Sequence, residues 1–243
     1  FAYTLLMLVG WIWLASSIGA RVPLSPRVAT LLFAIALLSV FLTPVTYLAY
    51  DLTSVEFHAA QTLLMRFGGG LMIPPIALAV LWALWPLRGA AARERPLRAA
   101  LIASVVLFSA GGIVGFLITS NNVRIPAHYH GSIVGVTLAM MGVVYLLLPR
   151  LGFAAPDSRL AAWQPYVYGA GQLMHILGLF WSGGYGVQRK VAGAEQALRT
   201  APEIAAMGLM GLGGLIAVIG GLMFLVIAIN STRRGERVAG RVR

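Results

Sequence analysis

Long apolar stretches alternate with short polar connections along the chain. A helix needs roughly 20 apolar residues to cross hydrocarbon about 30 Å thick, and seven stretches meet or approach this requirement. They cover residues 1–20, 28–50, 57–87, 97–120, 127–148, 164–186 and 203–230. The third contains a triple glycine at 68–70 and two prolines at 74–75, so we expect a kink or an unwound turn inside it. The pattern predicts an all-α integral membrane protein, a bundle of about seven transmembrane helices.

The composition supports this class. Of 243 residues, 59% are hydrophobic and only 10% are charged, whereas soluble domains carry about 25% charged residues. The absence of cysteine excludes disulfides, thiolate metal sites, iron–sulfur clusters and covalently attached c-type haem. The chain begins with Phe rather than Met and shows no cleavable signal pattern, so we expect a processed or truncated N-terminus.

The basic residues indicate the orientation of the helices. Thirteen of the 18 lysines and arginines lie in the odd-numbered connections and the C-terminal tail, four lie in the even-numbered connections, and Arg66 lies within a span. The positive-inside rule then places the C-terminus in the cytoplasm and the start of the fifth span at the outer face. We expect a multi-pass protein of a bacterial-type inner (plasma) membrane, with a transmembrane domain over residues 1–232 and a basic cytoplasmic tail over 233–243. The net charge of +11 suits anionic headgroups, and its distribution over short loops argues against nucleic-acid binding.

Two histidines, His128 and His130, open the fifth span, and Pro126 suits its first turn. Residues two apart on a helix point about 200° away from each other, so these imidazoles cannot readily grip one ion. They suit two separate ligands, one on each side of the helix, and haem is the natural candidate because one imidazole fills one axial position of its iron. Gly131 and Gly135 follow on the next turns and would let a flat macrocycle approach the backbone. The alternative is that both imidazoles lie among lipid headgroups and bind water.

The residues around these histidines carry a family resemblance. The stretch FSAGGIVGFLITSNNVRIPAHYHGSIVGVTLAMMGVVYLLLPRLG, residues 108–152, resembles the ninth and tenth helices of subunit I of the haem–copper oxidases, the cytochrome c oxidase subunit I family. A Gly-Gly-containing helix leads there through a polar loop into an Ala-His-x-His motif. The stretch MHILGLFWSGGYGVQRK, residues 174–190, resembles the eleventh helix and the basic pair that follows it. The chain would then correspond to helices six to twelve of that twelve-helix fold, its C-terminal half.

The resemblance implies a role for each matching residue. His128 would be the axial ligand of a high-spin haem at the oxygen site, and His130 would ligate a low-spin haem on the opposite face. Arg189 and Lys190 match a basic pair that contacts haem propionates, since carboxylates near the surface favour cationic partners; the alternative is that both are solvated loop charges. His175 matches a histidine that is not a haem ligand, and we expect it to be hydrogen-bonded inside the bundle.

The resemblance also implies cofactors and partners. One or two haems would be bound, and an N-terminal half or companion chain would supply the second axial histidine of the low-spin haem. Electrons would come from cytochrome c or a quinol. The chain would also contact other membrane subunits and the lipid bilayer.

The chain departs from the family at the oxygen-site copper. That copper needs a histidine of the sixth helix and an adjacent pair of the seventh, but residues 41–50, where the pair should fall, read FLTPVTYLAY. One further imidazole, His58, cannot replace a pair, so copper is a doubtful cofactor of this chain. The lysine of the eighth helix is also missing, and Arg66 is the charge in that region. Such an intramembrane arginine would pair with a carboxylate, with Asp51 and Glu56 as candidates, line a polar cavity, or extend to the surface.

Three functions remain open from the sequence. In the first, the chain would be a haem-binding electron-transfer subunit of an oxidase-type oxidoreductase whose copper site is completed elsewhere. Alternatively, it is a degenerate relative that transfers electrons through haem only, or a non-catalytic membrane scaffold. The missing histidine pair favours the second over the first on chemistry alone, and whether the chain belongs to an enzyme stays open.

Overall fold

Helices make up almost all regular structure in the computed structural model, which describes residues 2–85, 91, 93–191, 198 and 200–239. The chain divides into two compact units, residues 1–89 and 90–243, and each is described by itself. Every stretch predicted to span the membrane coincides with a helix or an interrupted helix, and five of these are long and apolar enough to cross a bilayer. The prediction of an all-helical, multi-pass membrane protein is therefore confirmed at this level. The first residue, the end of the third predicted span and the last four residues of the predicted tail lie outside the described residues.

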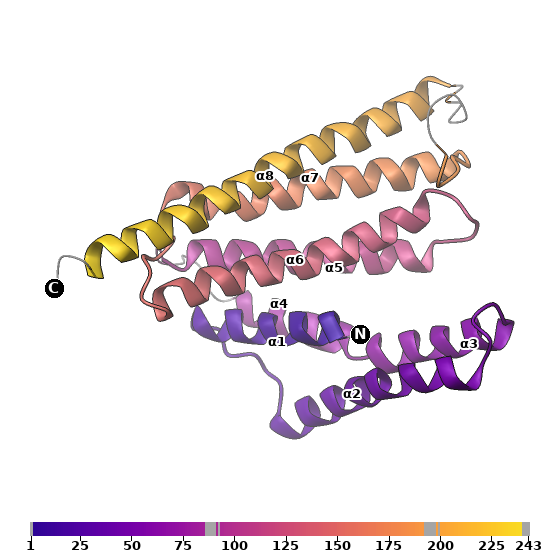
Figure 1. The fold of residues 1–243 in the computed structure, drawn as a ribbon, viewed down its shortest axis with the longest axis horizontal. Coiled ribbons are helices and arrows are strands. Elements are labelled where there is room, and N and C mark those ends of the chain that lie inside the picture. Colours follow the sequence, from indigo (N-terminus) through magenta and orange to yellow (C-terminus); the bar gives the residue numbers. More distant parts are fainter. Residues whose placement is uncertain (1, 86–90, 92, 192–197, 199, 240–243) are drawn as a thin grey trace. The chain divides into compact units, whose positions relative to one another are not determined.

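The first unit contains three helical passes (Figure 1). They are α1 (Ala2–Ser17), α2 (Pro26–Ala49) and an interrupted pass built from α3 (Val55–Leu63), the π-helical turn η1 (Leu64–Gly69) and α4 (Ile73–Leu84). Serine side chains start two of them: Ser25 Oγ accepts a hydrogen bond from the backbone N–H of Val28, and Ser54 Oγ accepts one from that of Phe57. Such caps satisfy backbone donors that a helix leaves free at its first turn.

The break expected in the third pass is confirmed. The π-helical turn ends at Gly69, and α4 restarts at Ile73, just before the two prolines. Gly68 lies so close to α2 that an added Cβ would be 1.7 Å from Ser39 Oγ. The irregular backbone therefore lies against protein, which is where membrane helices tolerate such breaks.

Arg66 does not form the ion pair that the sequence suggested. Its side chain is exposed, and no carboxylate of the described residues pairs with it. Asp51 binds its own loop instead: its Oδ1 accepts hydrogen bonds from the hydroxyl and the backbone N–H of Thr53. These bonds stabilise the charged form and hold the pKa of the Asp51 carboxyl below its usual range, the hydroxyl bond having the larger effect. Pairing of Arg66 with Asp51 or Glu56 is thus wrong.

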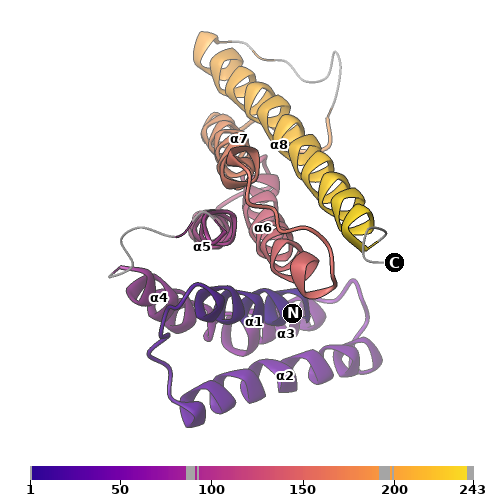
Figure 2. The same cartoon turned by 90° about the vertical axis from the view of Figure 1, so that its left-hand side faces the viewer.

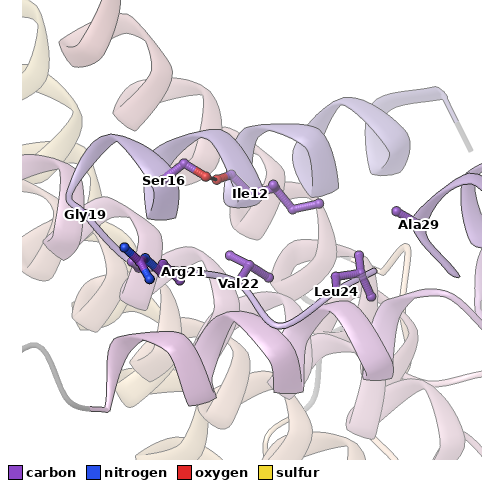
Figure 3. Close-up of a pocket in the computed structure, with 8 residues that line it drawn as sticks. Ile12, Ser16, Gly19, Arg21, Val22, Leu24 and Ala29 are labelled. Carbon is purple, nitrogen blue, oxygen red and sulfur yellow. Dashed lines mark hydrogen bonds between the residues drawn. The ribbon is translucent and has the colours of Figure 1, made fainter. Parts of the chain in front are cut away.

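A hollow of about 510 Å³ lies between the end of α1 and the connection to α2 (Figure 3). Its lining residues are Ile12, Ser16, Gly19, Ala20, Arg21, Val22, Leu24 and Ala29. The Ser16 hydroxyl donates to the Ile12 carbonyl 2.8 Å away and is thereby occupied. The lining offers no histidine or carboxylate, so this hollow has no metal-binding chemistry.

The second unit consists of four helices, and each runs antiparallel to the helix before it (Figures 1 and 2). They are α5 (Arg95–Phe116), α6 (Arg124–Arg150), α7 (Arg159–Gly184) and α8 (Ala201–Ala239). α5 lies against α6, and α8 lies along α7. The last helix carries a row of large exposed apolar side chains that suits contact with lipid, among them Leu215, Val218, Leu222 and Leu225.

Glycines set the close approach of these helices. A Cβ on Gly111 would lie 2.6 Å from the Ser132 backbone nitrogen, and a Cβ on Gly213 would lie 2.4 Å from that of His175. Small residues play this part in membrane helix packing because they let backbones touch. In the last helix, Gly213 and Gly220 make such close contacts with α7, whereas Gly211 has open space around it.

A buried polar cluster links α6, α7 and α8. The Tyr145 hydroxyl donates to Gln164 Oε1 at 2.9 Å, and Gln164 Nε2 donates to the Gly220 carbonyl at 3.0 Å. Both side chains are almost fully buried, with exposed fractions of 1% and 0%. Buried polar groups of this kind are stable only when each finds a partner.

We expect Tyr145→Phe to lower the free energy of unfolding by about 1 kcal/mol, because Gln164 Oε1 stays buried and loses its donor. Unfolding in mixed detergent micelles, followed by circular dichroism, measures this change. Tyr166→Phe is the matched control, since Tyr166 lies on α7 and is 41% exposed. Equal destabilisation by both variants would show that the hydrogen bond of Tyr145 does not contribute to the free energy of unfolding.

Candidate functional site

The opening of α6 is fixed by the loop that precedes it. Asn122 is buried; its Oδ1 accepts a hydrogen bond from the Arg124 backbone N–H at 2.9 Å, and its Nδ2 donates to the Gly183 carbonyl at 3.1 Å. One side chain therefore starts α6 and ties it to the end of α7. Pro126 falls within the first turn, as expected. The two histidines follow on a helix end that is hydrogen-bonded to the end of α7.

His128 points toward α5. Its Nδ1 lies 2.7 Å from the Gly111 carbonyl oxygen, which can only accept, so Nδ1 is the donor and the neutral form of this ring has its lone pair on Nε2. Gly115 leaves room for the ring, since a Cβ there would lie 2.6 Å from Nδ1. An imidazole held by Nδ1 on a backbone carbonyl with Nε2 free is the arrangement that metal-ligating histidines adopt.

His130 points toward α7. Its ring meets that of His175 edge to face, with centroids 4.9 Å apart and an interplanar angle of 72°. Within the described part of the chain, its ring nitrogens have no hydrogen-bond partner, and the side chain is half-buried. Nδ1 of His175 in turn lies 2.9 Å from the Met210 carbonyl oxygen of α8. The expectation that His175 is hydrogen-bonded inside the bundle is confirmed.

The two imidazoles thus leave α6 toward different neighbours, as the spacing of two residues predicts. One contacts α5 and the other contacts α7, so they do not converge on one ion. Among the described residues, no group of three or more histidines and carboxylates could enclose a metal. Two separate single-donor positions suit an ion whose remaining ligands come from elsewhere, as in a porphyrin.

The predicted basic pair lies at the same end of the second unit as these histidines. The Val123 backbone N–H donates to the Val187 carbonyl at 3.1 Å, and Asn122 forms a β-bridge with Gln188. The loop before α6 and the loop after α7 are therefore joined. Arg189 is half-buried, and its Nε donates to Asn121 Oδ1.

Lys190 is exposed and has a left-handed backbone, with φ at 63°. A residue other than glycine rarely adopts this conformation. The structure brings the pair to the end of the second unit where α6 begins, and propionate binding by these two residues stays a prediction.

Sequence reasoning treated Arg124 only as a loop charge, but the structure places it beside the site. Its guanidinium lies 4.8 Å above the Phe180 ring, and its Nε is buried without a partner among the described residues. Gly183 makes room for the side chain, since a Cβ there would lie 2.5 Å from Arg124 Cγ. The signal in the sequence is its position in the first turn of the span, four residues before His128.

Comparisons with known proteins give relatives but no function. No family model and no solved structure matches the chain. An uncharacterized protein of Rickettsia prowazekii is 39% identical over 138 residues, which is 52% of this chain and 26% of that protein. An uncharacterized protein of Aquifex aeolicus is 28% identical over 69 residues, 28% of this chain and 18% of that protein. The chain therefore matches about a quarter or less of the length of these relatives.

Proposed function

We propose that the chain is a haem-binding membrane subunit of a respiratory electron-transfer complex that resembles cytochrome c oxidase subunit I. The observation that carries the proposal is the placement of His128 and His130. Their rings diverge from one helix end toward α5 and α7, and the proton on Nδ1 of His128 leaves Nε2 as a free ligand atom. The His128 ring packs against α5 where Gly115 leaves room for it, and this fixed position favours a ligand over a hydrated histidine among headgroups.

The residues present fit two haems. His128 would hold the iron of a high-spin haem, and His130 would hold that of a low-spin haem on the other face. A bound haem would supply the one-electron chemistry, and the two histidines would present one nitrogen ligand on each side of one helix end. Arg189, Lys190 and Arg124 would neutralise propionates at the outer end, where charge-assisted hydrogen bonds are strong.

The remaining parts of the proposal concern the surroundings. The seven passes would correspond to helices six to twelve of the oxidase fold, with the C-terminus in the cytoplasm of a bacterial-type inner membrane. An N-terminal half or companion chain would supply the second axial ligand to the low-spin haem. Cytochrome c or a quinol would donate electrons.

A second candidate is electron transfer through haem without oxygen reduction. It is favoured by the side chains of α2 at the positions where the copper ligands are expected. Where the copper-binding pair is expected, the side chains are engaged in packing within the first unit. The Thr46 hydroxyl accepts a hydrogen bond from Gln61 Nε2 at 2.7 Å, and the Tyr47 ring packs edge to face on Phe57 with centroids 5.0 Å apart. Neither side chain resembles an imidazole ligand.

The reduced-minus-oxidised spectrum of the purified complex tests the proposal, and we expect the signal of b- or a-type haem. Copper analysis of the same sample separates the two candidates, since copper in equal amount to high-spin haem supports oxygen reduction and its absence supports electron transfer only. A complex without haem would refute both and leave the scaffold.

A further inference from the structure

We infer that His175 is a positioning residue that fixes the ring plane of His130. This inference rests on the proposed function, because it assigns His175 a task at the low-spin haem. His175 itself touches no iron in this arrangement; it acts through His130.

The rings of His175 and His130 are in direct contact. His175 meets His130 edge to face, with centroids 4.9 Å apart and planes at 72°. Such an arrangement is preferred by aromatic pairs, and rotation of either ring out of it loses contact area. Because neither ring nitrogen of His130 has a hydrogen-bond partner among the described residues, this contact restrains its rotation where a hydrogen bond restrains His128.

The His175 ring is itself held by a hydrogen bond to α8. Its Nδ1 donates to the Met210 carbonyl oxygen of α8 at 2.9 Å, so the ring cannot turn without leaving a backbone acceptor unpaired. The glycines of α8 allow the two helices to approach closely enough for this hydrogen bond. Gly213 meets the His175 backbone nitrogen at 2.4 Å, measured from an added Cβ, and a Cβ on Gly214 would lie 3.4 Å from Nδ1.

These two contacts connect three helices. α8 orients His175 on α7, and His175 orients His130 on α6, so the ring plane of a candidate ligand depends on a backbone carbonyl two helices away. The orientation of an axial imidazole determines the splitting of the iron d orbitals. Residues that orient a ligand from behind are therefore expected to alter the metal's spectrum and affinity.

The experiment compares three purified complexes. One carries the unchanged chain, one carries the His175→Asn variant and one carries the His175→Phe variant. Asparagine can donate to the Met210 carbonyl but lacks a ring to contact His130, whereas phenylalanine keeps a ring edge and lacks the donor. His58→Gln is the matched control, since it removes an exposed imidazole from α3. Three quantities are measured: haem content, the low-spin electron paramagnetic resonance signal and the rate of haem loss to apomyoglobin.

We expect His175→Asn to shift and broaden the low-spin signal and to speed haem loss about tenfold, near the lower limit for an orienting partner. His175→Phe should change both less, and His58→Gln should change neither. Haem bound in full with an unchanged signal in both His175 variants would overturn the inference and leave the proposed function standing. An unchanged chain without haem would instead overturn the proposed function.

Discussion

Replacing His130 with alanine is expected to abolish the low-spin haem signal, whereas replacing His128 with alanine is expected to leave that signal in place. The physical reason is the divergence of the two rings: His130 contacts α7, and His128 is held on α5 by the Gly111 carbonyl. Loss of one imidazole therefore leaves the other ring and its neighbours intact. The His128 variant should lose the high-spin component instead.

Reduced-minus-oxidised spectra and electron paramagnetic resonance of purified complexes measure both components. His58→Ala is the control for loss of an imidazole elsewhere in the chain. If both the His128 and the His130 variants keep full wild-type spectra, neither ring binds haem. If each variant loses both signals while the complex unfolds, a second pair of variants, His128→Gln and His130→Gln, retains polarity and separates ligation from folding.

Much of the fold follows from the apolar pattern. Helix ends need polar residues and helix interiors need apolar ones in lipid, so all seven predicted passes coincide with helices or an interrupted helix. The break near Gly68 follows because triple glycine and paired prolines cannot continue a regular helix. The opposite directions of His128 and His130 follow from helix geometry alone, because two residues span about 200°.

The neighbours of these side chains could not be predicted in the same way. Which ring meets which helix depends on interhelical register, and glycine contacts such as Gly111 against Gly131 set that register. The acceptor of His128 lies 17 residues away, and that of His175 lies 35 residues away. No local periodicity encodes such pairs.

The partners of Arg66 also could not be predicted from the sequence. Its pairing was inferred from the cost of an intramembrane charge and the nearness of Asp51 and Glu56 in sequence. The Arg66 side chain, which lies in the π-helical turn, is exposed instead, and the Asp51 carboxylate accepts hydrogen bonds from Thr53.

Three glycines of α5 give the second large prediction, because the same substitution should have three different results. On Gly111 an alanine Cβ would meet backbone of α6 at 2.6 to 2.9 Å, which only a shift of the whole helix can relieve. We expect Gly111→Ala to lower the free energy of unfolding by about 2 kcal/mol. On Gly112 the Cβ meets nothing within 4 Å, so Gly112→Ala is expected to be neutral or to stabilise by up to about 1 kcal/mol.

On Gly115 the Cβ would lie 2.6 Å from Nδ1 of His128, and this neighbour is the end of a rotatable side chain. Gly115→Ala should therefore turn the imidazole off the Gly111 carbonyl at a cost of about 1 kcal/mol while the helices stay packed. The high-spin component should shift in this variant with the low-spin component unchanged. Detergent unfolding and the two spectra, taken on all three variants, distinguish helix packing from ligand placement. A Gly115→Ala complex with normal stability and a normal high-spin component would show that the orientation of His128 does not matter, and the assignment of that ring to iron would lose its structural basis.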